Sequence, residues 1–131
     1  MRVDALTSSS REQAPAAPSP LLEIANVMVH LYKEAFGRGP TKARAYFSGP
    51  DALVVLLEDI MTVAERQLVA LGENARVREQ RLLVQLALEE KKRSEVGRVL
   101  SRRALACVSG TDPGGDLAAE IFVLEPHTAS P

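Results

Sequence analysis

Two almost uninterrupted apolar runs constrain the fold of this chain more than any other feature of its sequence. They are Ala52–Leu57 (ALVVLL) and Leu117–Leu124 (LAAEIFVL), and Glu120 is their only charged residue. Both runs have the length of a β-strand, and turn-forming residues precede each of them. Continuous apolar runs are typical of strands that are covered on both faces. We therefore expect two strands that need apolar cover above and below the sheet.

Each apolar run has a neighbouring segment with which it can form a hairpin. Lys42–Phe47 alternates polar with small or apolar residues, as a half-exposed strand does, and the turn Ser48–Asp51 follows it. Ala104–Val108 is a second short strand, and the loop Thr111–Asp116 connects it to the last run. The sequence therefore predicts two hairpins.

The first helix is expected over Leu21–Phe36, where apolar residues recur at helical spacing. Ser19 is the expected N-cap, and Pro20 occupies the first helical position. A structural turn formed by Gly37, Gly39 and Pro40 ends the helix. The apolar stripe is wide, so we expect this helix to be buried on two sides.

Two further helices are expected between the hairpins. Thr62 and Glu65 have the spacing of a capping box, which opens a short helix ending near Gly72. A long helix follows over about Asn74–Leu100. Its expected inner line is Val77, Leu82, Leu86, Val96 and Leu100. Its expected outer face holds Arg78, Arg81, Glu89, Lys92 and Arg93.

The order of elements is helix, hairpin, short helix, long helix, hairpin, which predicts an α+β fold with a four-stranded antiparallel sheet packed with helices. One domain is expected over residues 20–125. Residues 1–19 are rich in Ser and Pro and are predicted to form a disordered arm, and residues 126–131 a frayed tail. We expect no secretory signal and no membrane span, and a cytoplasmic location that fits the single cysteine.

The residues predict no catalytic site, no cofactor site and no metal site. His30 and His127 have no cysteine at ligand spacing, and Cys107 lies within a predicted strand. Glu58 and Asp59 are adjacent, so in a strand their carboxylates would point to opposite faces. We therefore expect a protein that is not an enzyme.

Basic residues are the remaining candidates for binding. Arg38, Lys42 and Arg44 could contact an anion or a partner, although a helix C-terminus precedes them and its dipole disfavours anions. The basic segment 73–103 could contact RNA or an acidic partner. It contains no aromatic residue on which bases could stack, and the net charge of the chain is −1, so no nucleic acid is expected.

Three segments carry a resemblance to a known family. They are Leu31–Lys42 (LYKEAFGRGPTK), Leu57–Arg66 (LEDIMTVAER) and Asp116–Glu125 (DLAAEIFVLE). In these segments the chain resembles the MpsC-type bacterial domain family. It departs from the family at Ser101–Arg103, where a glycine is usual. The resemblance implies a link to a sodium-translocating, membrane-potential-generating system whose other components are membrane proteins.

From this resemblance we expect a non-enzymatic accessory or regulatory protein of a membrane ion transport system, for sodium or bicarbonate, acting by protein–protein contact. The alternatives are an anion or small-molecule sensor that uses the Arg38 loop and the basic helix and, less favoured, an RNA-binding module. We also expect a homodimer, because two helices can cover only one face of four strands. In the alternative arrangement, helices on opposite faces of the sheet cover both within one chain.

Overall fold

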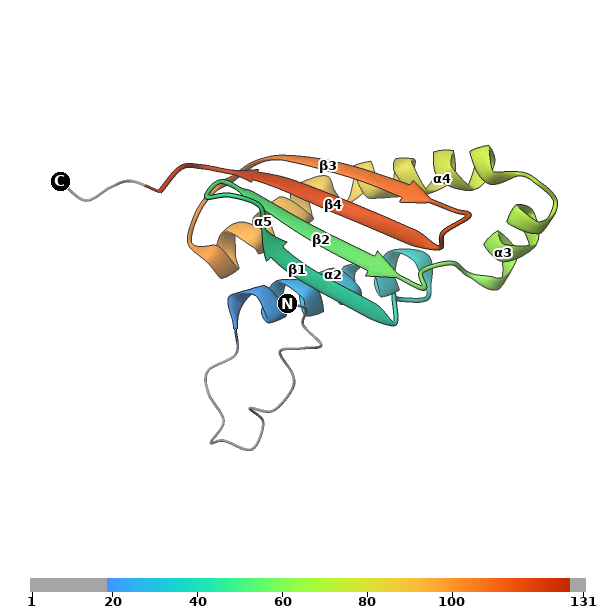
Figure 1. Ribbon diagram of the computed structural model, residues 1–131, viewed down its shortest axis with the longest axis horizontal. Coiled ribbons are helices and arrows are strands. Elements are labelled where there is room, and N and C mark those ends of the chain that lie inside the picture. The colour runs from blue at the N-terminus through green and yellow to red at the C-terminus, as the bar shows by residue number, and fades with distance from the viewer. Residues whose placement is uncertain (1–18, 128–131) are drawn as a thin grey trace, which may run out of the picture.

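The computed structural model describes residues 19–127. In chain order the elements are α2 (Pro20–Phe36), β1 (Lys42–Phe47), β2 (Ala52–Glu58), α3 (Val63–Ala70), α4 (Asn74–Ala87), α5 (Glu89–Leu100), β3 (Ala104–Asp112) and β4 (Leu117–Leu124). The strands form one antiparallel sheet in the order β1-β2-β4-β3 (Figure 1). The predicted α+β class and the two hairpins are therefore confirmed. The predictions for the arm and the end of the tail concern residues 1–18 and 128–131, which lie outside the described residues.

Helix α2 begins and ends where its local sequence predicts. The Ser19 hydroxyl accepts hydrogen bonds from the amides of Leu21 and Leu22, at 3.1 and 3.4 Å, and Pro20 is the first helical residue. Gly37 takes the left-handed conformation (φ 81°) that closes the helix. The helix packs on β1 and against α5, so it is buried on two sides as expected.

The long helix predicted over residues 74–100 is interrupted at Leu88, which separates α4 from α5. The Leu88 amide is shared between the carbonyls of Val84 and Gln85, at 3.1 and 3.2 Å. This sharing tightens the turn locally towards 3₁₀ geometry. The Lys92 amide still donates to the Leu88 carbonyl at 2.9 Å, so the hydrogen-bonded ladder continues through the break. Ser101 ends α5 in a left-handed conformation (φ 55°).

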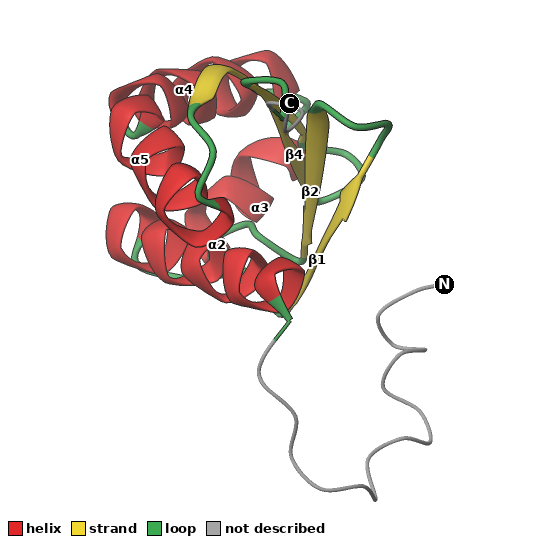
Figure 2. Ribbon diagram, turned by 90° about the vertical axis from the view of Figure 1, so that its left-hand side faces the viewer, coloured by secondary structure: helices red, strands yellow, loops and turns green. Residues whose placement is uncertain are grey.

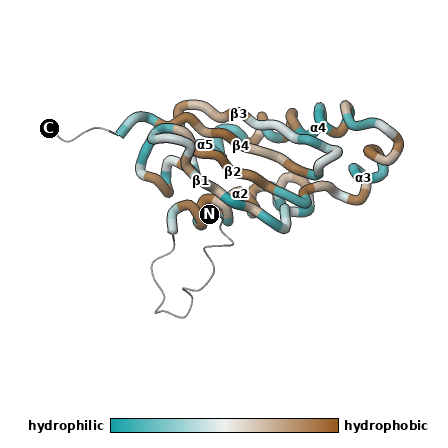
Figure 3. The backbone as a smooth tube through the Cα atoms, in the orientation of Figure 1, coloured by the Kyte–Doolittle hydropathy of each residue, from teal (hydrophilic) through white to brown (hydrophobic). Residues whose placement is uncertain are grey.

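All the described helices lie on one face of the sheet, so the fold has two layers (Figure 2). Leu53, Val55 and Leu57 of β2 are fully buried beneath them, whereas Val54 and Leu56 on the other face are only half-buried. Figure 3 shows the hydrophobic residues along α2, β2 and β4. The expectation that the apolar strands are covered on both faces is therefore wrong. Hydrophobic content alone does not reveal that helices cover only one side.

Candidate functional site

The three cations predicted to contact an anion do not form a free cationic site. The Arg38 guanidinium lies 2.9 Å from the Asp59 carboxylate, and Arg44 lies 3.2 Å from Glu58. Arg66 also pairs with Asp59, at 2.7 Å. Hydrogen bonds from Thr41, Arg38 and Arg66 lower the pKa of Asp59 to about 2. The carboxylates thus occupy the positions that an anion would take beside Arg38 and Arg44.

The capping box at the start of α3 continues into a buried ion pair. The Glu65 amide donates to the Thr62 hydroxyl at 3.2 Å, and the Thr62 amide donates to the Glu65 carboxylate at 2.9 Å. Arg81 donates two hydrogen bonds to the same carboxylate, at 2.8 and 2.6 Å, and stacks over the Phe36 ring. Burial opposes ionisation of Glu65, but the hydrogen bonds from Arg81 and Thr62 hold its pKa below the usual value. Arg81 thereby fastens α4 to the start of α3.

A second ion pair lies in the core between α5 and β4. Lys92 Nζ donates to Glu120 at 2.8 Å, and both side chains are 0% exposed. The Tyr32 hydroxyl donates to the other Glu120 oxygen at 2.6 Å and accepts from Gln85 at 2.8 Å. Ser109 also donates to Glu120. This network, formed by Tyr32, Gln85, Lys92, Ser109 and Glu120, links the helices α2, α4 and α5 to the sheet.

The groups around this network are poorly suited to catalysis. Burial, together with the charge of Glu120, raises the pKa of the Cys107 thiol to about 12. The same two causes raise the pKa of Tyr32. Both groups are therefore protonated near neutral pH, and the ion pair beside them is sealed from solvent. The network is suited to holding helices and sheet together rather than to reacting with a substrate.

The positions of Arg81 and Lys92 overturn the predicted outer face of the helix, on which both were placed. Leu82 and Leu86, predicted to be buried, are 40% and 53% exposed. The physical reason is that the inward-facing side of α4 and α5 must neutralise the buried carboxylates of Glu65 and Glu120. One signal could have revealed this: strand alternation puts Glu120 on the same face as its core neighbours in β4.

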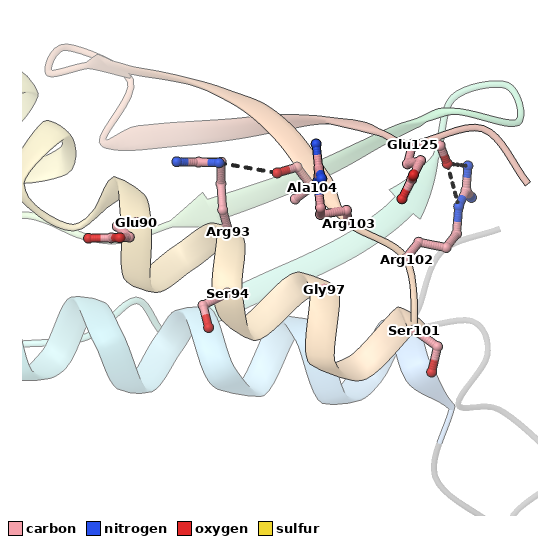
Figure 4. Close-up of a pocket in the computed structure, with 9 residues that line it drawn as sticks. All are labelled: Glu90, Arg93, Ser94, Gly97, Ser101, Arg102, Arg103, Ala104 and Glu125. Atoms are coloured by element: carbon pink, nitrogen blue, oxygen red, sulfur yellow. Dashed lines mark hydrogen bonds between the residues drawn. The ribbon is translucent and has the colours of Figure 1, made fainter.

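A hollow of about 510 Å³ lies between α5 and the first residues of β3. Figure 4 shows Arg93 donating to the Ala104 carbonyl and Arg102 donating to the Glu125 carbonyl. The residues that line the hollow are Glu90, Arg93, Ser94, Gly97, Ser101, Arg102, Arg103, Ala104 and Glu125. Arginines and carboxylates are both present, so the hollow is polar without being strongly cationic.

The helix-free side of the sheet is an extensive apolar surface in the described part of the chain. The strand registers place Tyr46, Val54, Ile121 and Val108 in one row across all four strands. Neighbouring rows add mostly small or apolar residues. We call this surface the open face, and it comprises Tyr46, Ala52, Val54, Leu56, Ala106, Val108, Gly110, Ala119, Ile121 and Val123.

Water reaches the open face directly, because no helix covers it. Val108 is 61% exposed and Ile121 39%. Lys42 and Arg44 lie at one end of the same face, because their registers place them opposite Glu58 and Leu56. Two of the three predicted contact residues therefore border the open face, whereas Arg38 lies in the loop after α2. A contiguous apolar surface of this kind commonly marks an interaction site.

These features define a small two-layer α+β domain with an open sheet face. Residues 19–127 contain no helix long and apolar enough to cross a membrane, and no cluster of side chains suited to hold a metal ion. A protein-family model matches residues 21–126, and its description is the Na⁺-translocating membrane potential-generating system (MpsC). The chain therefore belongs to the MpsC family. Searches of curated proteins and of solved structures found no match.

Proposed function

We propose that this protein is a non-enzymatic, cytoplasmic accessory or regulatory component of a membrane system that transports sodium or bicarbonate. It acts by protein–protein contact. The family description supports the link to a sodium-linked membrane potential. The helices of the described region cannot span a membrane, so the link to such a system would run through a membrane-embedded partner.

The observation that carries this proposal is the open face. Its apolar rows would bury the hydrophobic part of a partner, and a cation at its end would meet an acidic residue there. Arg44 already bonds Glu58, so Lys42 is the cation better placed to contact a partner. A partner surface with apolar side chains and a carboxylate at one end fits this arrangement.

Membrane-potential measurements in a deletion strain test the proposal. With a potentiometric dye at low and high external sodium, we expect deletion of the gene to alter the sodium-dependent potential. The wild-type gene should restore the potential, and Ile121→Lys should not, because it places a charge at the centre of the open face. The matched control is Leu71→Lys, since Leu71 is an exposed apolar residue outside the sheet. Full restoration by a folded, equally abundant Ile121→Lys protein would contradict the proposal.

A second candidate function is the binding of a small anion in the hollow beside α5. The buried Nε of Arg93 has no hydrogen-bond partner, although the Glu89 carboxylate lies 3.6 Å from it, and Arg103 and Ser101 line the same space. Thermal denaturation with bicarbonate, phosphate or nucleotides tests this candidate, because a ligand that binds only the folded state raises the melting temperature. The absence of a shift at millimolar concentrations of all three would argue against it.

A further inference from the structure

We infer that β3 is a pairing edge at which two copies of this chain join their sheets, antiparallel and two-fold symmetric, into one eight-stranded sheet. The open face described above does not form this interface. The pairing surface is the side of β3 that faces away from β4, to which no strand of the described chain is bonded. The inference does not depend on the proposed function.

The two edges of the sheet differ in how well they are protected against pairing. Natural edge strands avoid pairing by being short, by carrying charges, or by containing proline. β1 is short and carries Lys42 and Arg44. β3 is the longest strand in the described sheet, and between Ala104 and Thr111 it has neither a charged residue nor a proline. β3 is therefore the edge that favours addition of another strand.

Side chains from α4 and α5 lie beside this edge. They delimit the stretch of β3 that is open to pairing, which we call the window. Arg78 of α4 donates to the Thr111 carbonyl at 3.3 Å, and Arg93 of α5 donates to the Ala104 carbonyl at 3.3 Å. These bonds lie at the two ends of the strand. They leave residues 105–110 between them, of which the Gly110 carbonyl accepts a hydrogen bond from Gln85 at 3.4 Å. Leu82 and Leu86 follow Arg78 at intervals of four residues, so they lie on the same side of α4, towards the edge. An added strand would cover these exposed leucines.

The window is complementary to itself, which selects a second copy as its occupant. With Val108 on the two-fold axis, Cys107 lies opposite Ser109 of the second copy, and Ala106 lies opposite Gly110. The β-bulge between Ala104 and Ala106 adds one residue to the strand. When this extra residue is left out of the count, Ala104 lies opposite Thr111 of the second copy.

The charges at the two ends of the strand complete this self-complementarity. The same register places Arg103 opposite Asp112 of the second copy, and the symmetry repeats the pair at the other end. Both side chains are exposed, and no ion pair within residues 19–127 includes either of them. Opposite charges in directly opposed positions stabilise antiparallel pairs, and like charges there destabilise them. No like charges meet in this register.

This pairing determines how the open faces lie in the dimer. The two-fold axis of an antiparallel strand pair stands perpendicular to the sheet, so each copy keeps its helices on the same side. Both open faces then lie on the opposite side and remain available. The dimer would present them as one continuous surface.

Light scattering on charge-reversal variants tests the inference. At micromolar concentration the wild-type chain should have a mass near twice 14.2 kDa. Asp112→Arg should raise the dissociation constant at least about tenfold, because it places two arginines opposite each other. The double variant Arg103→Asp with Asp112→Arg restores opposite charges and should restore the dimer. Ile121→Lys on the open face is the control and should leave the dimer intact.

Cysteine cross-linking tests the register itself. Residues on the two-fold axis of an antiparallel pair have Cα atoms about 4.5–5.5 Å apart, which a disulfide can span. Val108→Cys should therefore form a covalent dimer under mild oxidation, whereas Val54→Cys and the parent chain with Cys107 should not. A mass of one chain at all concentrations would overturn the inference. So would a dimer that survives Asp112→Arg but is lost with Ile121→Lys, since that result would place the interface on the open face.

Discussion

Replacement of Lys92 by alanine tests the buried network most directly, because sequence alone predicts an exposed lysine there. Lys92 is 0% exposed and its ammonium lies 2.8 Å from Glu120, which is itself 0% exposed. An exposed lysine truncated to alanine costs less than about 0.5 kcal/mol of unfolding free energy. Removal of one partner from a buried ion pair costs about 3–5 kcal/mol, because the other charge remains buried and unpaired. The structure therefore predicts the larger loss for Lys92→Ala.

Equilibrium unfolding in urea measures this loss. The neighbouring Lys91 is exposed, so Lys91→Ala is the matched control and should cost less than about 0.5 kcal/mol. The whole domain is expected to have about 5–15 kcal/mol of stability, so Lys92→Ala should shift the urea midpoint substantially. A cost below about 1 kcal/mol would refute the reasoning, because it would mean that water reaches the Lys92–Glu120 pair.

A double replacement tests the contribution of the unpaired charge. In Lys92→Met with Glu120→Leu, both charges are replaced by apolar groups of similar volume, so no unpaired ion remains. The Tyr32 hydroxyl then loses its acceptor, which should cost about 1–3 kcal/mol. The double variant should therefore be more stable than Lys92→Ala. If it were equally unstable, the unpaired carboxylate would not explain the loss of stability in the single variant.

Three further predictions concern the cap, its carboxylate and the cysteine. Thr62→Ala should cost about 0.5–2 kcal/mol in denaturant melts while Thr62→Ser retains most of the stability, because only alanine lacks the hydroxyl that accepts from the Glu65 amide. The pKa of Glu65 is lower in the folded than in the unfolded chain, so its contribution to stability is present above the unfolded pKa and is lost as the pH falls below it. Glu65→Gln should flatten the wild-type decline in melting temperature between about pH 5 and pH 3, and an unchanged slope would contradict this. The Cys107 thiol, with a pKa of about 12, should react with iodoacetamide at pH 8 far more slowly in the native protein than in urea, and equal rates would show that it is accessible and ionised.

Local sequence was sufficient to predict the secondary structure where short-range chemistry decides it. Ser19 and Gly37 bound α2 because a hydroxyl at one end and a left-handed glycine at the other satisfy the terminal backbone groups. Thr62 and Glu65 form their capping box within four consecutive residues. The hairpins could be predicted for the same reason, since turn residues separate the paired strands. The resemblance to the MpsC family also lies in contiguous segments, so it can be recognised from the sequence without the structure.

The burial of charged residues depended on partners that are distant in the chain. Glu120 lies 28 residues from Lys92, and Glu65 lies 16 residues from Arg81. On α4 the leucines and the polar residues each follow a helical period, so periodicity alone does not say which set faces the sheet. The inward-facing carboxylates favour the set with Arg81, and Leu82 and Leu86 are left exposed as a consequence.

The open face and the unprotected edge are properties of the tertiary structure alone. An apolar run predicts a strand, and the run itself does not say how many helices will cover it. That outcome depends on the placement of α2 beside α5 on one side of the sheet, which their mutual packing decides. The sequence therefore determined the elements and the family of this protein. Only the assembled sheet determined which apolar surface was left for a partner, because side-chain burial is shared among segments that meet only in the folded chain.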